Sequence, residues 1–273
     1  MRILVKIGGA QLERPEPRAR LCTAIASARS LGDEVVVVHG GGNQIRALTG
    51  ALGVADRYHE GLRVTDAATA QAALMVLGGS VNRTLVHALQ AAGVPAAGLT
   101  GADGGTFSAK PLRRDGVDLG FVGEVDQVDS ALVDALLKAG FTPVIGTVAP
   151  RAGAPADEPL FNINADHAAG PLCRALRCEA LLFLTDVAGV LDGDGQPMPL
   201  LTDADCERLV ATGVASGGML PKLDAARRGA RENPSAIVKI APADADDCVR
   251  SALRDGVGSR FFARSNGREL QRG

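Results

Sequence analysis

Short apolar runs alternate with longer stretches of helical pattern along most of the chain. The β-branched run at residues 3–7 and the valines of residues 34–38 are the first two, and each is followed by glycines. Continuous apolar runs of this length are typical of strands that are buried on both faces. Similar runs predict strands at residues 96–99, 142–148, 180–185, 236–240 and 258–262.

Between these runs, the spacing of apolar residues predicts helices. They are expected at residues 17–31, 43–52, 65–92 (one or two helices, capped by Thr65 or Asp66), 130–139, 165–176, 203–212, 219–232 and 243–255. Strands that alternate with helices indicate parallel βαβ units. We therefore expect an α/β fold, a three-layer αβα sandwich with a mainly parallel central sheet.

Two segments depart from this rhythm. Residues 100–125 are polar and glycine-rich with short alternating stretches, which predicts a hairpin. Residues 151–158 resemble a loop and are expected to join two lobes of a single domain spanning 1–273. The N-terminal lobe would cover about 1–150 and the C-terminal lobe about 160–265. Beyond residue 264 the polar tail is expected to fray.

Composition narrows the class of protein. The net charge of −2 offers no basic excess for nucleic acid. No signal peptide is recognisable, and no apolar run approaches the ~18 residues of a membrane span, so we expect no membrane partner. Five scattered cysteines without a secretory signal are typical of reduced thiols and a cytoplasmic protein.

Five motifs follow predicted strands or begin predicted helices. They are VKIGG (5–9), VHGGGNQI (38–45), GLRVTD (61–66), FNINAD (161–166) and GGMLPK (217–222). Glycine turns offer bare N–H groups to anionic oxygens, and lysines beside them supply charge for a phosphoryl group. The sequence contains neither a GxxxxGK[ST] P-loop nor a GxGxxG fingerprint. These features indicate a kinase that is not of the P-loop type.

Two lysines are the leading candidates for catalysis. Lys6 interrupts an apolar strand two residues before a glycine pair, and a buried lysine needs a partner or a route out of the core. An edge-strand lysine that points to solvent is the alternative. Lys222 lies near a predicted helix start, where a cation is unfavourable unless an anion is near. A plain surface lysine is its alternative.

The candidate substrate contacts are polar groups beside the glycine turns. Arg63 lies in a predicted loop before a helix, where its guanidinium could bind a substrate carboxylate through two hydrogen bonds. An arginine in a salt bridge within the protein is equally compatible with this position. Asn162, Asn164 and Asp166 alternate and should share one side, but Asp166 is also a possible helix N-cap. His39 is expected to be structural, and the other histidines show no ligand spacing.

In this order, the motifs resemble those of the amino acid kinase family. GGSVNRTLV from Gly78, GLTGADGG from Gly98, LTDVAGVLDG from Leu184 and GSRF from Gly258 extend the resemblance over nearly the whole chain. GLRVTD together with NINAD is selective, and is similar to members that phosphorylate N-acetyl-L-glutamate in arginine biosynthesis. Gly258-Ser259 stands where the family commonly has Gly-Thr, a minor departure.

The resemblance implies transfer of the γ-phosphoryl group of MgATP to the side-chain carboxylate. By position, Lys6 and Lys222 would stabilise the transferring group, and Asp166 would orient both lysines. Gly8 and Gly9 would lie along the phosphates, and the small-molecule substrate would be held by Gly41, Gly42, Arg63 and Asn162. The nucleotide would contact Asp186, Val187, Gly189, Val190, Leu191, Val214 and Ser216. Mg²⁺ would be held by ATP oxygens and water rather than by protein metal ligands.

The same resemblance bears on assembly and on rival functions. Arginine-inhibited hexameric members carry an extra N-terminal helix, whereas this sequence begins at the first strand, so we expect an arginine-insensitive homodimer. The rivals are a kinase of lysine biosynthesis acting on carrier-bound aminoadipate, a non-catalytic amino acid sensor, and an aspartate kinase. The GLRVTD motif disfavours the kinase of lysine biosynthesis. The presence of Lys6, Asp166 and Lys222 disfavours a non-catalytic sensor. The missing regulatory extension disfavours an aspartate kinase.

Overall fold

The computed structural model describes residues 1–114, 116–245 and 247–262. Its main element is an eight-stranded sheet with the order β12-β14-β13-β11-β1-β2-β8-β5. All pairs of neighbours are parallel except β13 and β14. The strands are β1 (Arg2–Ile7), β2 (Glu34–His39), β5 (Ala96–Leu99), β8 (Thr142–Gly146), β11 (Ala180–Thr185), β12 (Leu200–Leu201), β13 (Ile237–Pro242) and β14 (Ser259–Phe261). The tail expected to fray lies outside the described residues.

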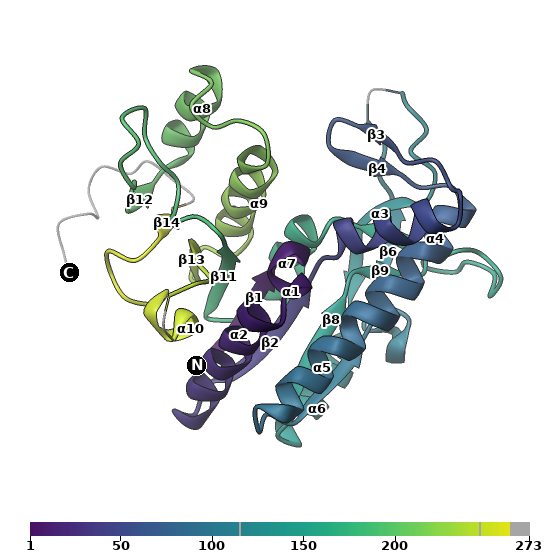
Figure 1. Cartoon of the computed structure of the whole chain (residues 1–273), viewed down its shortest axis with the longest axis horizontal. Helices are drawn as coiled ribbons and strands as arrows, with labels where there is room; N and C mark the ends of the chain where they lie inside the picture. Colours follow the sequence, from purple (N-terminus) through teal and green to yellow (C-terminus); the bar gives the residue numbers. More distant parts are fainter. Residues whose placement is uncertain (115, 246, 263–273) are drawn as a thin grey trace.

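Helices cover both faces of this sheet, because successive strand residues point to opposite sides. Ile3, Val5 and Ile7 pack on one face with α1 (Gly9–Glu13), α2 (Pro15–Ser30), α3 (Gly42–Ala51), α4 (Ala67–Leu74), α5 (Val81–Ala91) and α10 (Cys248–Ser251). Leu4, Val36 and Leu181 pack on the other face with α6 (Ala131–Lys138), α7 (Ala165–Ala175), α8 (Asp203–Ala211) and α9 (Met219–Glu232). The α/β three-layer fold is thus confirmed (Figure 1).

A second, four-stranded sheet has the order β6-β7-β10-β9. Its strands are β6 (Phe107–Pro111), β7 (Val122–Val128), β9 (Val148–Ala149) and β10 (Phe161–Ile163). The predicted hairpin is the antiparallel pair β6–β7, preceded by a 3₁₀ turn at Asp103–Gly105. A further hairpin, β3 (Arg57–His59) with β4 (Leu62–Val64), was not predicted, because three-residue strands carry too little pattern to detect.

One helical segment runs unbroken from α4 through a π-helix (Met75–Ser80) into α5. Asp66 caps its start by accepting a hydrogen bond from the Thr69 N–H at 2.8 Å. Because the helix continues through Gly78 and Gly79, the segment Ala67–Ala91 has the length and composition to cross a membrane. The expectation that no segment is long and apolar enough for a membrane span is corrected to that extent. A core helix passes the same test, and Leu77, Leu85 and Leu89 are buried within this protein.

The helix expected at 243–255 is much shorter than predicted. β13 extends to Pro242, and α10 covers only Cys248–Ser251. Asp247, which precedes α10, has φ of 51°, a left-handed conformation that cannot continue a right-handed helix. Residues 243–245 and Asp247 therefore form part of the connection rather than an additional helical turn.

Candidate active site

A cavity of about 390 Å³ opens at the carboxyl ends of β1 and β2. The structure brings nine of the sequence-predicted residues to its lining, from segments far apart in the chain. They are Lys6, Gly8, Gly9, Gly41, Gly42, Arg63, Asn162, Asp166 and Lys222. The two lysines, 216 positions apart by subtraction of their numbers, thus border one space. The carboxyl edge of a parallel sheet is where ligands bind in folds of this kind.

Lys6 lies near the end of β1 on the face that packs against α7. Its side chain is buried, with the residue only 5% exposed. The ammonium Nζ lies 2.5 Å from Oδ1 of Asp166, in the first turn of α7. A buried charge requires such a partner, and the positive end of the helix dipole further favours a carboxylate there. The alternative of a lysine that points to solvent is thereby excluded.

Lys222 reaches the same cavity from the first turn of α9. Its Nζ donates a hydrogen bond to the Gly218 carbonyl at 3.3 Å, within its own helix start. No ion pair of Lys222 occurs among the described residues, so Asp166 pairs with Lys6 but not with Lys222 in this conformation. The ammonium of Lys222 therefore remains available to an anion that enters the cavity.

The alternation in FNINAD places Asn162, Asn164 and Asp166 on the cavity side, while Phe161, Ile163 and Ala165 are buried. Asn164, not Asp166, is the N-cap of α7: its side chain accepts hydrogen bonds from Asp166 N at 2.9 Å and His167 N at 3.4 Å. The N-cap alternative for Asp166 is therefore wrong, because Asn164 already occupies that position. The Asp166 carboxylate is left to interact with Lys6.

Arg63 lies on strand β4 rather than in the predicted loop, because the chain forms the short β3–β4 hairpin here. Nη1 donates to Oδ1 of Asp56, and Nη2 donates to the Gly42 carbonyl at 2.9 Å. Its guanidinium also lies 4.9 Å from the centre of the Tyr58 ring. The salt-bridged alternative thus describes the structure correctly, and the side chain lines the cavity as well.

The glycines allow two turns to approach each other closely. A Cβ on Gly9 would lie 2.9 Å from Gly41 Cα, closer than such atoms come in proteins. The turn after β1 therefore lies directly against the turn after β2, which opens α3. Gln44 Nε2 reinforces the contact by donating to the Gly9 carbonyl at 3.1 Å. The helix start offers unpaired N–H groups to an anion in the cavity.

His39 ends β2 and is fully buried. Nδ1 lies 3.1 Å from the Gly40 carbonyl, and Nε2 lies 3.0 Å from the Asn82 amide nitrogen. The neutral ring satisfies both contacts when Nδ1–H donates and Nε2 accepts. Burial lowers the pKa of His39 to about 4, with a smaller opposing effect of the Gly40 carbonyl. The structural role predicted for this histidine is confirmed.

The residues assigned to the nucleotide are not among those that line this cavity. Asp186, Val187, Gly189, Val190 and Leu191 follow β11, and Val214 and Ser216 lie between α8 and α9. The turn that follows the first segment approaches the second segment, since a Cβ on Gly193 would lie 3.8 Å from Val214 Cγ2. Ser259 fixes the first segment, because its buried hydroxyl accepts a hydrogen bond from Val190 N at 2.8 Å. Ser259, which stands where the family commonly has a threonine, thus retains a hydroxyl at this position.

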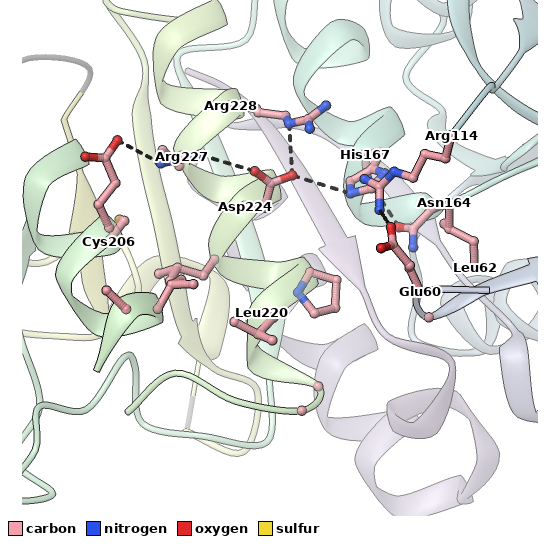
Figure 2. A pocket seen from close by; sticks show the side chains of 18 residues that line it. Glu60, Leu62, Arg114, Asn164, His167, Cys206, Leu220, Asp224, Arg227 and Arg228 are labelled. Carbon is pink, nitrogen blue, oxygen red and sulfur yellow. Dashed lines mark hydrogen bonds and ion pairs between the residues drawn. The ribbon is translucent and has the colours of Figure 1, made fainter. Parts of the chain in front are cut away.

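A larger groove of about 1070 Å³ adjoins the cavity and shares Gly61, Leu62 and Asn164 with it. Figure 2 shows that one side carries the Arg114–Glu60 pair and the other the helix α9 residues Asp224 and Arg228. His167 Nε2 lies 3.9 Å from Asp224 Oδ2 between them. The pKa of His167 is lowered, first by burial and then by Arg228, against the opposing effect of Asp224.

Sequence reasoning missed several residues of the cavity lining, notably Arg46, Tyr58 and Thr147. Arg46 was detectable, because it follows Gly42 by four positions and so shares its helix face. Tyr58 belongs to the unpredicted hairpin and offered no comparable signal. No group of three or more His, Cys, Asp or Glu side chains suited to a metal ion occurs in the part of the chain that the structure describes.

Comparison with known proteins gives matches over most of the chain. The model of the amino acid kinase family matches residues 1–239. An acetylglutamate kinase of Koribacter versatilis is 42% identical over 259 residues, covering 94% of this chain and 96% of that protein. An acetylglutamate kinase of Acidobacterium capsulatum is 44% identical over 261 residues, covering 94% and 98%.

Solved structures support the fold. N-acetylglutamate synthase from Neisseria gonorrhoeae, complexed with coenzyme A and N-acetyl-glutamate, superimposes with a TM-score of 0.82 at 24% identity. That match covers 97% of this chain and 60% of the synthase chain. Carbamate kinase from Giardia lamblia bound to AMP-PNP gives a TM-score of 0.69 at 14% identity, covering 96% and 98%. At these identities the likeness concerns the architecture alone.

Proposed function

Because this chain belongs to the amino acid kinase family, we propose that it transfers the γ-phosphoryl group of ATP to the side-chain carboxylate of N-acetyl-L-glutamate. The product is the acyl phosphate N-acetyl-L-glutamyl 5-phosphate, an intermediate of arginine biosynthesis. The observation that carries the proposal is the convergence of Lys6, Lys222 and Asp166 with two glycine turns on one cavity.

The lysines stabilise the charge of the phosphoryl group as it moves between two oxygens. Lys6, fixed by Asp166, and Lys222, free of an ion pair among the described residues, supply two ammonium groups. Gly8 and Gly9 contribute main-chain N–H groups beside the phosphates. Phosphoryl transfer depends on positioning and electrostatic stabilisation, and the acceptor carboxylate is already ionised at pH 7. The reaction therefore needs no general base.

The amino acid substrate lies toward the N-terminal half of the cavity. Gly41 and Gly42 contact it through main-chain N–H groups, and Arg63 and Asn162 contact it through side chains. We assign residues of about 1–150 to an amino-acid-binding lobe and of about 160–265 to a nucleotide-binding lobe. The nucleotide contacts Asp186, Val187, Gly189, Val190, Leu191, Val214 and Ser216.

Mg²⁺ accompanies ATP, where it neutralises phosphate charge. The residues of the cavity fit a metal that is held by phosphate oxygens and water. Asp166 is the carboxylate among the described lining residues, and its Oδ1 already pairs with Lys6. A dedicated Mg²⁺ site would need further oxygen ligands from the protein.

A homodimer is part of the proposal. Within the segment Ala67–Ala91, only 44% of the most apolar 18-residue window is buried inside the protein, and Met75 is 50% exposed. We assign Met75 to the contact between the two copies, because association would remove this large apolar side chain from water. We also place the reaction in the cytoplasm, with which five buried free thiols are compatible.

The reaction is tested by trapping acyl phosphate with hydroxylamine in the presence of MgATP. N-acetyl-L-glutamate should give hydroxamate, whereas N-acetyl-L-aminoadipate, N-acetyl-L-aspartate and free L-glutamate should give far less. Preference for the aminoadipate derivative would instead identify the kinase of lysine biosynthesis. Failure with every acceptor, despite retained amino acid binding, would identify a sensor.

A further inference from the structure

Arg46 occupies the rim of the cavity, one helical turn beyond Gly42 on α3. It lines the cavity, yet 62% of its side chain is exposed. Nη2 donates a hydrogen bond to the Tyr58 hydroxyl at 3.2 Å, and Cζ lies 5.6 Å from the centre of that ring. The hairpin β3–β4 beside α3 (Figure 1) thus fixes the orientation of a guanidinium whose head remains open to the cavity.

The charges around Arg46 do not cancel. Asp56 is its acidic neighbour, with 3.6 Å between Arg46 Nε and Asp56 Oδ2. The same carboxylate accepts a hydrogen bond from the buried Arg63, which lies closer to it. One carboxylate shared by two guanidinium groups leaves one positive charge in excess. Because Arg63 is buried against Asp56 and Gly42 O, the accessible excess charge is that of Arg46.

N-acetyl-L-glutamate carries two carboxylates, and only one of them reacts. The reacting carboxylate must approach the ammonium groups of Lys6 and Lys222, which leaves the α-carboxylate to be held elsewhere in the cavity. Guanidinium groups match carboxylates in charge and geometry. Stacking on Tyr58 reduces the conformational freedom that Arg46 loses when it binds an anion.

We propose, on the basis of the proposed function, that Arg46 is a specificity-determining residue. It contacts the non-reacting carboxylate of the substrate, alongside Arg63. Tyr58 positions the guanidinium through its hydroxyl and its ring. The cavity thereby selects doubly charged acyl amino acids over analogues in which the α-carboxylate is neutral.

The test compares two variants of equal charge change with two substrates. Arg46→Gln removes the proposed contact. Arg57→Gln is the matched control, since Arg57 is also an exposed arginine, adjoins Tyr58 and does not line the cavity. The substrates are N-acetyl-L-glutamate and its α-amide, which lacks the charge at the proposed contact. Binding is measured by calorimetry without ATP, and kcat and KM by hydroxamate formation.

Arg46→Gln should weaken binding of N-acetyl-L-glutamate about tenfold, as expected for loss of a charge-assisted hydrogen bond. The larger part of the kinetic loss should be in KM, and the affinity for the α-amide should change much less. Arg57→Gln should match the wild type with both substrates. Equal losses for the two substrates, or none for N-acetyl-L-glutamate, would overturn the assignment of Arg46.

The proposed function and this inference fail in different ways. Wild-type protein that neither binds nor phosphorylates N-acetyl-L-glutamate overturns the function and, with it, the role of Arg46. Wild-type protein that does both, while Arg46→Gln has the same Kd, overturns the role of Arg46 alone. The exposed position of Arg46 allows the variant to fold, which an unchanged Tm verifies.

Discussion

At the scale of single residues, the site depends on how each charged group is partnered. Lys6 and Asp166 neutralise each other at 2.5 Å, while Lys222 contacts only a carbonyl of its own helix start among the described residues. Lys222 therefore contributes little to the folded structure, and its charge in the cavity is available for the reaction. Its substitution should affect catalysis and stability very differently.

Lys222→Ala should lower kcat by about 10²–10³, the usual cost of losing one charge contact to a transition state. The Tm should remain within about 2 °C of the wild type, because a partly exposed lysine without an ion pair stabilises little. Steady-state kinetics and thermal unfolding measure both quantities. Lys138→Ala, at an exposed position in α6, is the control. Unchanged turnover in Lys222→Ala would remove this residue from the mechanism.

His39 provides a prediction on pH. Its pKa is about 4 in the folded protein against 6.5 in the unfolded chain, so the unfolded chain binds the proton more tightly. The stability that it contributes is complete above pH 6.5 and is lost as the pH falls toward 4, on the order of 3 kcal/mol in all. Urea unfolding across this window measures the effect.

The control variants separate His39 from other titrating groups. His39→Gln should be less stable at pH 7, but its stability should fall less steeply between pH 6.5 and 4. His87→Gln, at an exposed position of α5, should follow the wild-type curve. The same slope in His39→Gln and wild type would show that another group governs the acid response.

At the scale of elements, the start of helix α7 positions part of the chemistry. Helix α7 begins with Asn164 as its cap, and this cap brings Asp166 toward Lys6. Helix α8 has an equivalent cap, a capping box in which Thr202 accepts from Asp205 N at 3.2 Å. The two caps provide similar stabilisation, but only the first lies at the cavity.

Asn164→Ala and Thr202→Ala should each lower the free energy of unfolding by about 1 kcal/mol, the usual value of an N-cap. Asn164→Ala should also lower kcat, because the first turn of α7 carries Asp166. Thr202→Ala should retain the wild-type kcat. Chemical denaturation and steady-state kinetics on both variants make the comparison. Equal kcat values in the two would show that the cap has no part in positioning Asp166.

The elements that could be predicted from sequence are those with long, regular patterns. The buried strands around Lys6 and Val38, the helix from Ala165 and the cap at Asp66 were all expected. The β3–β4 hairpin was not, so Arg63 was placed in a loop and its partner Asp56 was missed. Asp166 was considered as a cap because residue type alone cannot distinguish N-cap from N2 when Asn and Asp occur two positions apart.

At the scale of the whole molecule, the sequence did not predict which strands pair with one another in the central sheet. β1 lies between β2 and β11, and the second of these neighbours begins at Ala180. The motifs indicated that lysines 6 and 222 would meet, whereas nothing local specified which strands would bring them together.

The proposed homodimer is the prediction that belongs to this scale. Light scattering coupled to size-exclusion chromatography should give a mass of twice 28.0 kDa. Met75→Glu should shift the protein toward the monomer, because a charge in place of this exposed apolar side chain opposes its burial between two copies. Lys138→Glu places the same acidic side chain at an exposed position of α6 and should leave the mass unchanged. A monomeric wild type would contradict the proposal.

The central position of β1 also matters while the protein is being made. Lys6 pairs in register with Phe183 on one side and with Val38 on the other. At a translation rate of about 5–20 residues per second, roughly 7 to 29 seconds separate the synthesis of Val38 from that of Phe183. Throughout that interval the nascent chain has an unpaired strand edge next to Ile3 and Val5. Chaperones that bind extended apolar segments at the ribosome would therefore find their target here.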